Sequence, residues 1–447
     1  MARLRGGPER NYAVDEQPLR SELLSADQME QYGKTLAASH RLAPGRAPDQ
    51  LLMRLAANEE VLIDVCNLLT LAVTENRRIT PGGEWLLDNF YLIEEQIRTA
   101  KRHFPKGYSR ELPRLARGPS TGLPRVYDIA LQTISHGDGR VDPESLSRFV
   151  SAYQTVADLK LGELWAIPIM LRLALIENLR RVAARIAEGM KDRGLAGSWA
   201  DQMTEIAEKD PKSLILVVAD MARSNPPMTT QFVSEFVRRL QGQSAALALP
   251  LTWIERLLSE SHLTIEQLVQ SETQKQASSQ VSISNSIASL RFLGAMDWRK
   301  FVETMSLVEQ TLREDPGGVY EKMDFATRDH YRHVIEKTAR RSQLTEREVA
   351  QRAIQLAHQG ATHVSAASNA GNSDPSRERT SHVGHYLIDK GLPHLERVAE
   401  VQVSSFETLR RSGRQQPLLP YLGVIALITL LLTGSLLALV HAQLPAL

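Results

Sequence analysis

Apolar residues recur every three or four positions along most of this chain, which is the spacing of an amphipathic α-helix. Residues 49–75 are a clear example, because Leu51, Leu55, Leu62 and Leu69 fall on one face of a helix. No stretch alternates apolar and polar residues between hairpin turns, the pattern of a strand. The sequence therefore predicts an all-α fold, a multi-helix bundle.

Two further helices carry the candidate packing residues. Residues 84–104 place Trp85 and Phe90 on an apolar stripe. Residues 161–181 form the most apolar helix of the bundle, in which Pro168 should either begin the main segment or kink it. Both helices are expected to pack tightly against neighbours.

Two helix starts are legible from capping residues. Asp142 precedes Pro143, so that Asp142 can cap a helix whose first position is the proline. Thr345 and Glu348 have the spacing of a capping box. Helices should begin at these two places.

Composition divides the chain into five segments. The expected order is a mobile N-terminal arm over residues 1–47 with one short helix around residues 25–40, a helical domain over 48–358, a flexible linker over 359–381, a juxtamembrane helical segment over 382–417 and a transmembrane helix over 418–440. Whether residues 48–358 form one body or two subdomains is left open.

The segment 418–440 contains no charged residue and is long enough to cross the hydrocarbon core of a bilayer. Arg410, Arg411 and Arg414 precede it, and no Lys or Arg follows it. By the positive-inside rule the large N-terminal part is predicted to be cytoplasmic, with a single membrane pass and membrane lipid as a partner.

The chain has 53 basic and 52 acidic residues, so its net charge is close to zero. A nucleic-acid partner is therefore not expected, since such proteins concentrate positive charge against phosphates. The single cysteine also excludes an intrachain disulfide.

No motif for catalysis is recognisable. The chain lacks the full phosphate-binding loop Gly-x-x-x-x-Gly-Lys-Ser/Thr and a His-Glu-x-x-His zinc motif, so neither a catalytic residue, a metal site nor a cofactor site is predicted. A carboxylate pair for glycoside hydrolysis remains open. The acidic residues that could supply it are Glu84, Glu94, Glu95, Glu163 and Glu177.

Three stretches resemble the N-terminal region of cyclic beta-1,2-glucan synthases, large bacterial inner-membrane enzymes. They are EWLLDNFYLIEEQIRTAKRHFPKGYSRELPRL at 84–115, the segment from RVYDIALQTISHGDGR to LIENLRR at 125–181, and HVGHYLIDKGLPHLE at 382–396. The resemblance covers about residues 50–440. It implies localisation in the bacterial inner membrane.

The resemblance also implies an activity for the complete enzyme, which builds a β-1,2-glucan from UDP-glucose with a divalent metal and trims it with a phosphorylase-like module. The family's Asp-x-Asp and Gln-x-x-Arg-Trp transferase motifs do not occur in this chain. No catalytic residue of the family can therefore be assigned to this chain. The chain is expected to be the non-catalytic N-terminal portion of such an enzyme.

The expected partners are therefore the glycosyltransferase and phosphorylase modules, with glucan as a further candidate. The apolar helix 165–179 and the basic loop 106–125 are the faces expected to meet them. The candidate packing or interaction residues are Trp85, Phe90, Trp165, Pro168, Leu175 and Arg180. Two alternatives stay open, a stand-alone membrane-tethered helical adaptor and an α-helical carbohydrate hydrolase.

Overall fold

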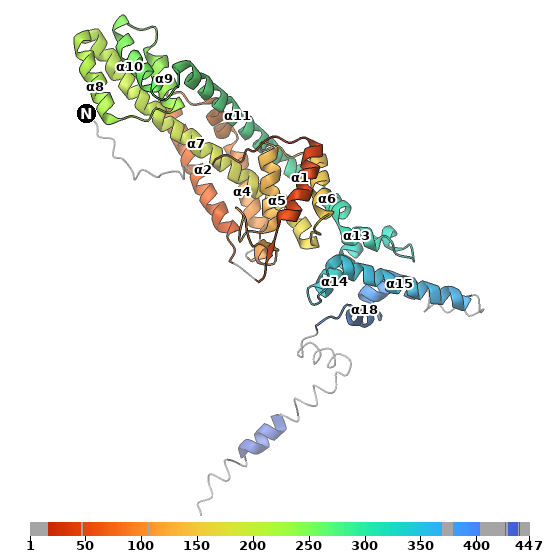
Figure 1. Ribbon diagram of the computed structural model, residues 1–447. Helices are drawn as coiled ribbons and strands as arrows, with labels where there is room; N and C mark the ends of the chain where they lie inside the picture. The colour runs from red at the N-terminus through yellow and green to blue at the C-terminus, as the bar shows by residue number, and fades with distance from the viewer. Residues whose placement is uncertain are drawn as a thin grey trace, which may run out of the picture. The chain divides into compact units, whose positions relative to one another are not determined.

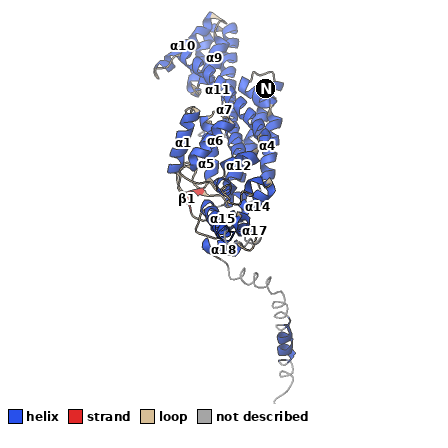
Figure 2. Ribbon diagram, turned by 90° about the vertical axis from the view of Figure 1, so that its right-hand side faces the viewer, coloured by secondary structure: helices blue, strands red, loops and turns tan. Residues whose placement is uncertain are grey.

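The computed structural model describes residues 17–45, 48–104, 107–368 and 379–402, together with 425, 428–436 and 438. Within these ranges the chain is helical almost throughout, which confirms the all-α prediction (Figure 2). The strands are two residues each, β1 (Leu42–Ala43) and β2 (Arg114–Leu115), and they pair antiparallel with Leu42 opposite Leu115. The chain divides into two compact units, residues 1–305 and 306–447.

Unit 1 is built around one very long helix, α7, against which most of the other helices pack (Figure 1). The α-helices of unit 1 are α1 (Ala26–Ser39), α2 (Leu51–Thr74), α3 (Pro81–Asp88), α4 (Phe90–His103), α5 (Arg125–His136), α6 (Pro143–Gln154), α7 (Leu161–Lys209), α8 (Leu214–Ser224), α9 (Thr230–Leu240), α10 (Ala248–Ser259), α11 (Ile265–Ala295) and α12 (Trp298–Met305). Short 3-10 turns lie at η1 (Tyr108–Arg110), η2 (Pro211–Ser213) and η3 (Ala245–Leu247).

Two hydrophobic cores form along α7. The main core surrounds α7 from Leu161 to Met190 and takes in α1 to α6, the second half of α11 from Ile283 and α12. The distal core surrounds α7 from Ala196 to Ala207 and is closed by α8, α9, α10 and the start of α11. Figure 1 shows α8, α9 and α10 gathered at one end of α7. The segment between the cores contains no core residue on α7.

Helix α7 runs unbroken to Lys209, well beyond the helix that the sequence predicted over residues 161–181. Pro168 lies inside it rather than at its start. Glycines on α7 let α9 approach closely: a Cβ at Gly189 would lie 3.0 Å from Gln231, and one at Gly197 would lie 3.1 Å from Arg239. Packing against α9 therefore offsets the intrinsic cost of glycine within a helix.

The helix predicted over residues 84–104 is interrupted at Asn89. The Asn89 amide donates to the Trp85 carbonyl at 2.9 Å, and its Oδ1 accepts a hydrogen bond from Arg291 at 2.8 Å. Because Asn89 is buried and serves both groups, it separates α3 from α4. The two predicted helix starts are confirmed: Asp142 caps α6 by accepting from the Ser145 N–H, and Thr345 and Glu348 form a reciprocal capping box before α15.

The segment predicted as an N-terminal arm, residues 1–47, contains α1. Ser25 and Gln28 form its capping box, and Met29, Leu36 and Ala37 are buried in the main core. Residues 17–45 are therefore part of the folded unit, while residues 1–16 and 46–47 lie outside the described residues.

Unit 2 has a smaller hydrophobic core of its own, made by its helices together with Tyr320. Its helices are α13 (Leu307–Leu312), α14 (Phe325–Ala339), α15 (Glu346–Ser368), α17 (Val383–Ile388) and α18 (Leu392–Val398), with 3-10 turns η4 (Tyr320–Lys322) and η5 (Arg379–Ser381). Helix α15 extends into the predicted linker 359–381, of which residues 369–378 lie outside the described residues.

No helix in the described ranges combines the length and the apolarity that a bilayer crossing requires. The predicted transmembrane helix 418–440 falls largely outside those ranges, and the described positions within it, 425, 428–436 and 438, are helical. Residues 403–417 of the predicted juxtamembrane segment also lie outside the described residues.

Candidate functional site

The six candidate residues from the sequence lie on three helices of unit 1. Trp85 on α3 is 40% exposed, whereas Phe90 on α4 is partly buried against the main core. On α7, Trp165 is partly buried and Pro168 is half-buried, while Leu175 is fully buried. The structure does not bring these side chains to one cavity.

The apolar helix 165–179, predicted to be a face for other modules, is the centre of the main core. Ile167, Leu171 and Leu175 are almost completely buried by the surrounding helices. The large apolar surface of this segment is therefore used inside unit 1, and its pattern reflects burial on nearly all sides rather than a face left for a partner.

The basic loop 106–125 is also partly internal. Arg114 is buried and donates to three backbone carbonyls, those of Pro48 and Gly122 at 2.9 Å and that of Ser109 at 3.2 Å. Arg125 is buried in a bidentate ion pair with Glu163, in which both nitrogen–oxygen distances are 2.7 Å. These two arginines hold the loop to the helices beneath it and are not free to meet a ligand.

Arg180, the sixth candidate, belongs to a buried charge cluster around Glu177, which we call the Glu177 cluster. The Glu177 carboxylate accepts from Arg54 at 3.0 Å, Arg180 at 3.2 Å and Arg181 at 2.8 Å, and its second oxygen accepts from Asn58 at 2.8 Å. Burial raises the pKa of Glu177, but Arg54, Asn58 and Arg181 outweigh it and bring the pKa to about 2. Glu177 is therefore ionised at neutral pH.

The carboxylates considered for glycoside hydrolysis do not form an acid and base pair in a cleft. Glu84, Glu94 and Glu95 are exposed on α3 and α4, whereas Glu163 and Glu177 are buried and bound to arginines. An ionised Glu177 has no proton to donate to a leaving group. This arrangement gives the hydrolase alternative no support.

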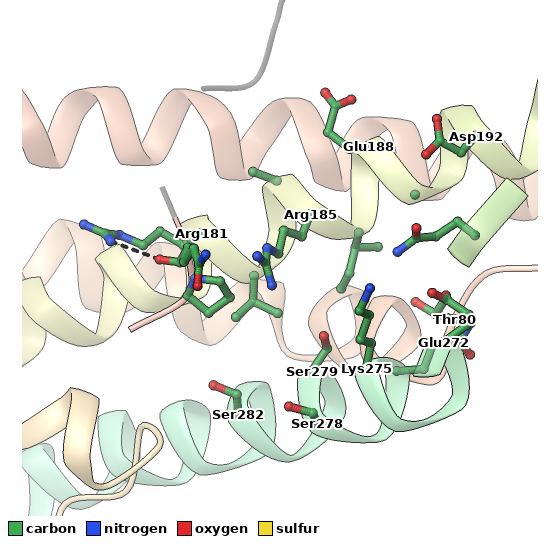
Figure 3. A pocket seen from close by; sticks show the side chains of 18 of the residues that line it. Thr80, Arg181, Arg185, Glu188, Asp192, Glu272, Lys275, Ser278, Ser279 and Ser282 are labelled. Carbon is green, nitrogen blue, oxygen red and sulfur yellow. Dashed lines mark hydrogen bonds between the residues drawn. The ribbon is translucent and has the colours of Figure 1, made fainter. Parts of the chain in front are cut away.

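A polar cleft of about 460 Å³ lies between α7 and α11, beside the end of the main core (Figure 3). Its walls are residues 181–193 of α7 and residues 272–282 of α11. Its edges are Gln17, Pro18 and Arg20, Thr80 at the start of α3, and Gln231 at the start of α9. The volume is that of a small-molecule site.

The acidic groups that line this cleft already have partners. Glu272 accepts from Thr230 at 2.9 Å and from Gln276 at 2.7 Å, and it lies 3.6 Å from Arg193. Asp192 accepts from Thr229 at 2.7 Å, and Glu188 pairs with Lys191 at 3.2 Å. Figure 3 shows Glu188 and Asp192 extending away from α11.

Three of the basic groups in the cleft are engaged as well. Arg181 binds Glu177, Arg20 lies 3.6 Å from Asp138, and Arg193 lies 3.6 Å from Glu272. Burial lowers the pKa of Arg193 despite the nearby acids, and its buried Nη2 has no hydrogen-bond partner among the described residues. The cleft therefore holds a guanidinium whose bonding is incomplete.

Two cations remain without an acidic partner. Arg185 forms no ion pair or hydrogen bond with any described residue, and Lys275 donates only to the Thr230 hydroxyl, at 3.3 Å. Figure 3 shows Arg185 reaching from α7 and Lys275 from α11 into the space between these helices, where the Ser279 hydroxyl also points. Sequence reasoning missed this cleft; the Gln- and Ser-rich stretch of α11 was the available signal.

In unit 2 the segment 382–396 has a histidine bound to a buried carboxylate. The Asp315 carboxylate accepts from His382 Nδ1 at 2.6 Å and from the Val383 N–H at 2.8 Å. Burial raises the pKa of Asp315, but these hydrogen bonds lower it by more, so the pKa lies below its ordinary value. A Cβ at Gly384 would collide with the Tyr331 hydroxyl, so glycine is required where α17 meets α14. Among the described residues no three His, Cys, Asp or Glu side chains are grouped to hold a metal ion.

No protein-family model matches the chain. The chain is 32% identical over 414 residues to the cyclic beta-(1,2)-glucan synthase NdvB of Rhizobium meliloti (strain 1021). The match covers 92% of this chain and 14% of that protein. The chain thus spans about one seventh of the length of its curated relative.

Proposed function

We propose that this chain, a glucan-synthase region of the NdvB type, is the non-catalytic N-terminal helical portion of a cyclic beta-1,2-glucan synthase. Its role is to support the glycosyltransferase module and to anchor it to the membrane. The observation that carries the proposal is the match, which extends over 92% of the chain.

The interior of unit 1 supports a structural role. The most apolar helix is used to build the core, and the buried acids Glu163 and Glu177 are neutralised by arginines of the same unit. Groups held in this way provide rigidity, and these two carboxylates are not available as acids or bases. The complete enzyme would supply the UDP-glucose site and the divalent metal in its other modules.

The outer face of α2 is the surface we assign to the transferase module. Met53 is 64% exposed, Ile63 40% and Leu71 50%, and helical geometry places the three on one side of α2. Exposed apolar side chains gathered on one helix face mark interaction sites. Because the relative is about seven times as long as the matched segment, the part of such an enzyme that lies outside this segment is the natural occupant.

The anchor is the chargeless segment 418–440. A length of about 20 apolar residues suffices to cross a bilayer, and the three arginines before it orient the helical units towards the cytoplasm of a bacterial inner membrane. The proposal therefore places units 1 and 2 on the side where a sugar nucleotide is available.

The test replaces the matched segment of the Rhizobium meliloti relative with this chain and measures β-1,2-glucan made from UDP-glucose by isolated membranes. We expect synthesis from the chimera and none when the segment is deleted. Ile63→Glu combined with Leu71→Glu should reduce synthesis about tenfold or more, since two charges would be buried in an apolar contact. Alkaline washing should leave the full chain in the membrane and release residues 1–402.

Ile215→Glu combined with Leu216→Glu on α8 is the matched control, because these side chains are 61% and 64% exposed and the variant receives the same two charges. It should leave synthesis within about twofold of the unsubstituted chimera. Glucan synthesis that is unchanged by deleting the segment would contradict the proposal and favour the stand-alone adaptor.

A further inference from the structure

We propose that the cleft between α7 and α11 binds the phosphate group of a small phosphorylated ligand through Arg185 and Lys275. The two cations come from facing helices, and their side chains reach into the same space (Figure 3). This site is separate from the proposed contact on α2, and its existence does not depend on the proposed support of the transferase module.

The balance of charge inside the cleft favours an anion. Of the three acidic residues, Glu188 is paired with Lys191 and Glu272 lies 3.6 Å from Arg193, while Asp192 is hydrogen-bonded to Thr229 and extends away from α11 (Figure 3). Arg185 and Lys275 have no such acid. A bound cation would face two uncompensated positive charges, whereas an anion would neutralise them.

The type of donor narrows the anion to phosphate. A guanidinium can donate two parallel N–H bonds to phosphate oxygens, and an ammonium adds a compact charge beside them. Ser278 and Ser279 offer hydroxyls that bond to no described residue, and the buried Arg193 Nη2 also lacks a partner. Tetrahedral phosphate, with several acceptor oxygens, can use donors that arrive from both helices.

The lining argues against a neutral sugar as the main determinant. None of the described residues that line the cleft is aromatic, so a sugar ring would have no flat apolar surface on which to stack. The cleft volume of about 460 Å³ nevertheless leaves room beyond the phosphate for a small organic group. Gln231 and Gln276 also line the cleft and can bond to hydroxyl groups.

The experiment is isothermal titration calorimetry on the purified full chain with pyrophosphate, glycerol 3-phosphate and glucose as separate probes. We expect both phosphates to bind and glucose not to bind. Tighter binding of glycerol 3-phosphate would identify a lipid headgroup as the source of the phosphate, and tighter binding of pyrophosphate a soluble ligand. Raising the salt concentration should weaken either interaction.

Arg185→Gln and Lys275→Gln should each weaken phosphate binding about tenfold, because each removes a charge-assisted hydrogen bond. Both side chains are exposed, so the variants should keep the far-UV circular dichroism and melting temperature of the parent. Lys209→Gln is the control: it removes an exposed cation at the far end of α7 and should bind as the parent does.

Phosphorus-31 NMR of pyrophosphate provides a second measurement, in which binding broadens the resonance. The proposal is overturned if neither phosphate binds, if glucose binds as tightly as the phosphates, or if the folded Arg185→Gln and Lys275→Gln variants bind phosphate as well as the parent does.

Discussion

Each unit contains a buried glutamate that binds three arginines, but the two clusters stabilise their surroundings differently. Around Glu177 in unit 1, Arg54 is 38% exposed and Arg181 is 16% exposed, so water reaches two of the cations. Around Glu309 in unit 2, Arg313 is 44% exposed and Arg328 is 14% exposed, but Arg332 is fully buried. Water therefore reaches arginines of both clusters, and the Glu309 cluster differs in holding one arginine that is completely enclosed.

The supporting structure differs as well. Glu177 lies on a helix of 49 residues that is already held by the main core. Glu309 lies on α13, a helix of six residues. Its carboxylate accepts hydrogen bonds from the Tyr320 hydroxyl at 2.7 Å and from Arg332 of α14 at 2.6 Å, which tie α13 to these two residues. In unit 1 the buried ion cluster therefore adds to the stability that a large hydrophobic core already provides. In unit 2 it supplies stability that the smaller hydrophobic core lacks.

Glu309→Gln should have the largest effect. It leaves Arg332 buried without its main counter-charge, and breaking a buried pair in this way costs about 3 kcal/mol. Because all five tryptophans lie in unit 1, tryptophan fluorescence follows that unit alone, while far-UV circular dichroism follows both. In urea, only the circular dichroism transition should move to lower concentration.

Glu336→Gln is the control for unit 2, since its partner Arg340 is 55% exposed and the loss should stay below about 0.5 kcal/mol. An equal shift of the fluorescence transition in Glu309→Gln would show that the two units do not unfold separately.

Glu177→Gln should have a smaller effect, about 2 kcal/mol, because water can hydrate Arg54 and Arg181 when the carboxylate is lost. The measurement is urea unfolding followed by tryptophan fluorescence. Glu205→Gln on the same helix is the control, as Glu205 is 63% exposed and pairs only with Lys209. A loss in Glu177→Gln as large as that in Glu309→Gln would remove the distinction between the clusters.

The acid response of unit 1 should be the smallest of the three effects. The pKa of Glu177 is about 2 in the folded chain and 4.5 in the unfolded chain, so the ionised carboxylate stabilises the fold fully above pH 4.5. This stabilisation is lost as the pH falls from 4.5 towards 2, and the loss is about 1.4 kcal/mol at about pH 3.5. Glu177→Gln should lack this part of the pH dependence, and an unchanged acid profile in that variant would assign the response to other groups.

Local chemistry explains which features the sequence predicted. Asp142 with Pro143, and Thr345 with Glu348, are neighbours along the chain, so their capping roles follow from spacing alone. The unbroken course of α7 could not be predicted, because Gly189 and Gly197 weaken an isolated helix and are tolerated only through the contacts with α9.

The charge clusters and the cleft depend on distant parts of the chain. Arg54 and Glu177 are far apart in sequence, and only the packing of α2 on α7 brings them together. Arg185 and Lys275 likewise face each other because α11 returns alongside α7. Apolar periodicity reports that a face is buried, but it does not identify the helix that covers it.

The position of the distal core within unit 1 has a consequence for synthesis on the ribosome. Its residues, from Ala196 to Leu268, are contiguous in sequence and can associate as soon as they emerge. The main core also requires Ile283 to Met305, which are made afterwards. During translation, the distal core should therefore be complete while the main core still lacks residues 283–305. The apolar surface of α7 in the main core is exposed at that stage.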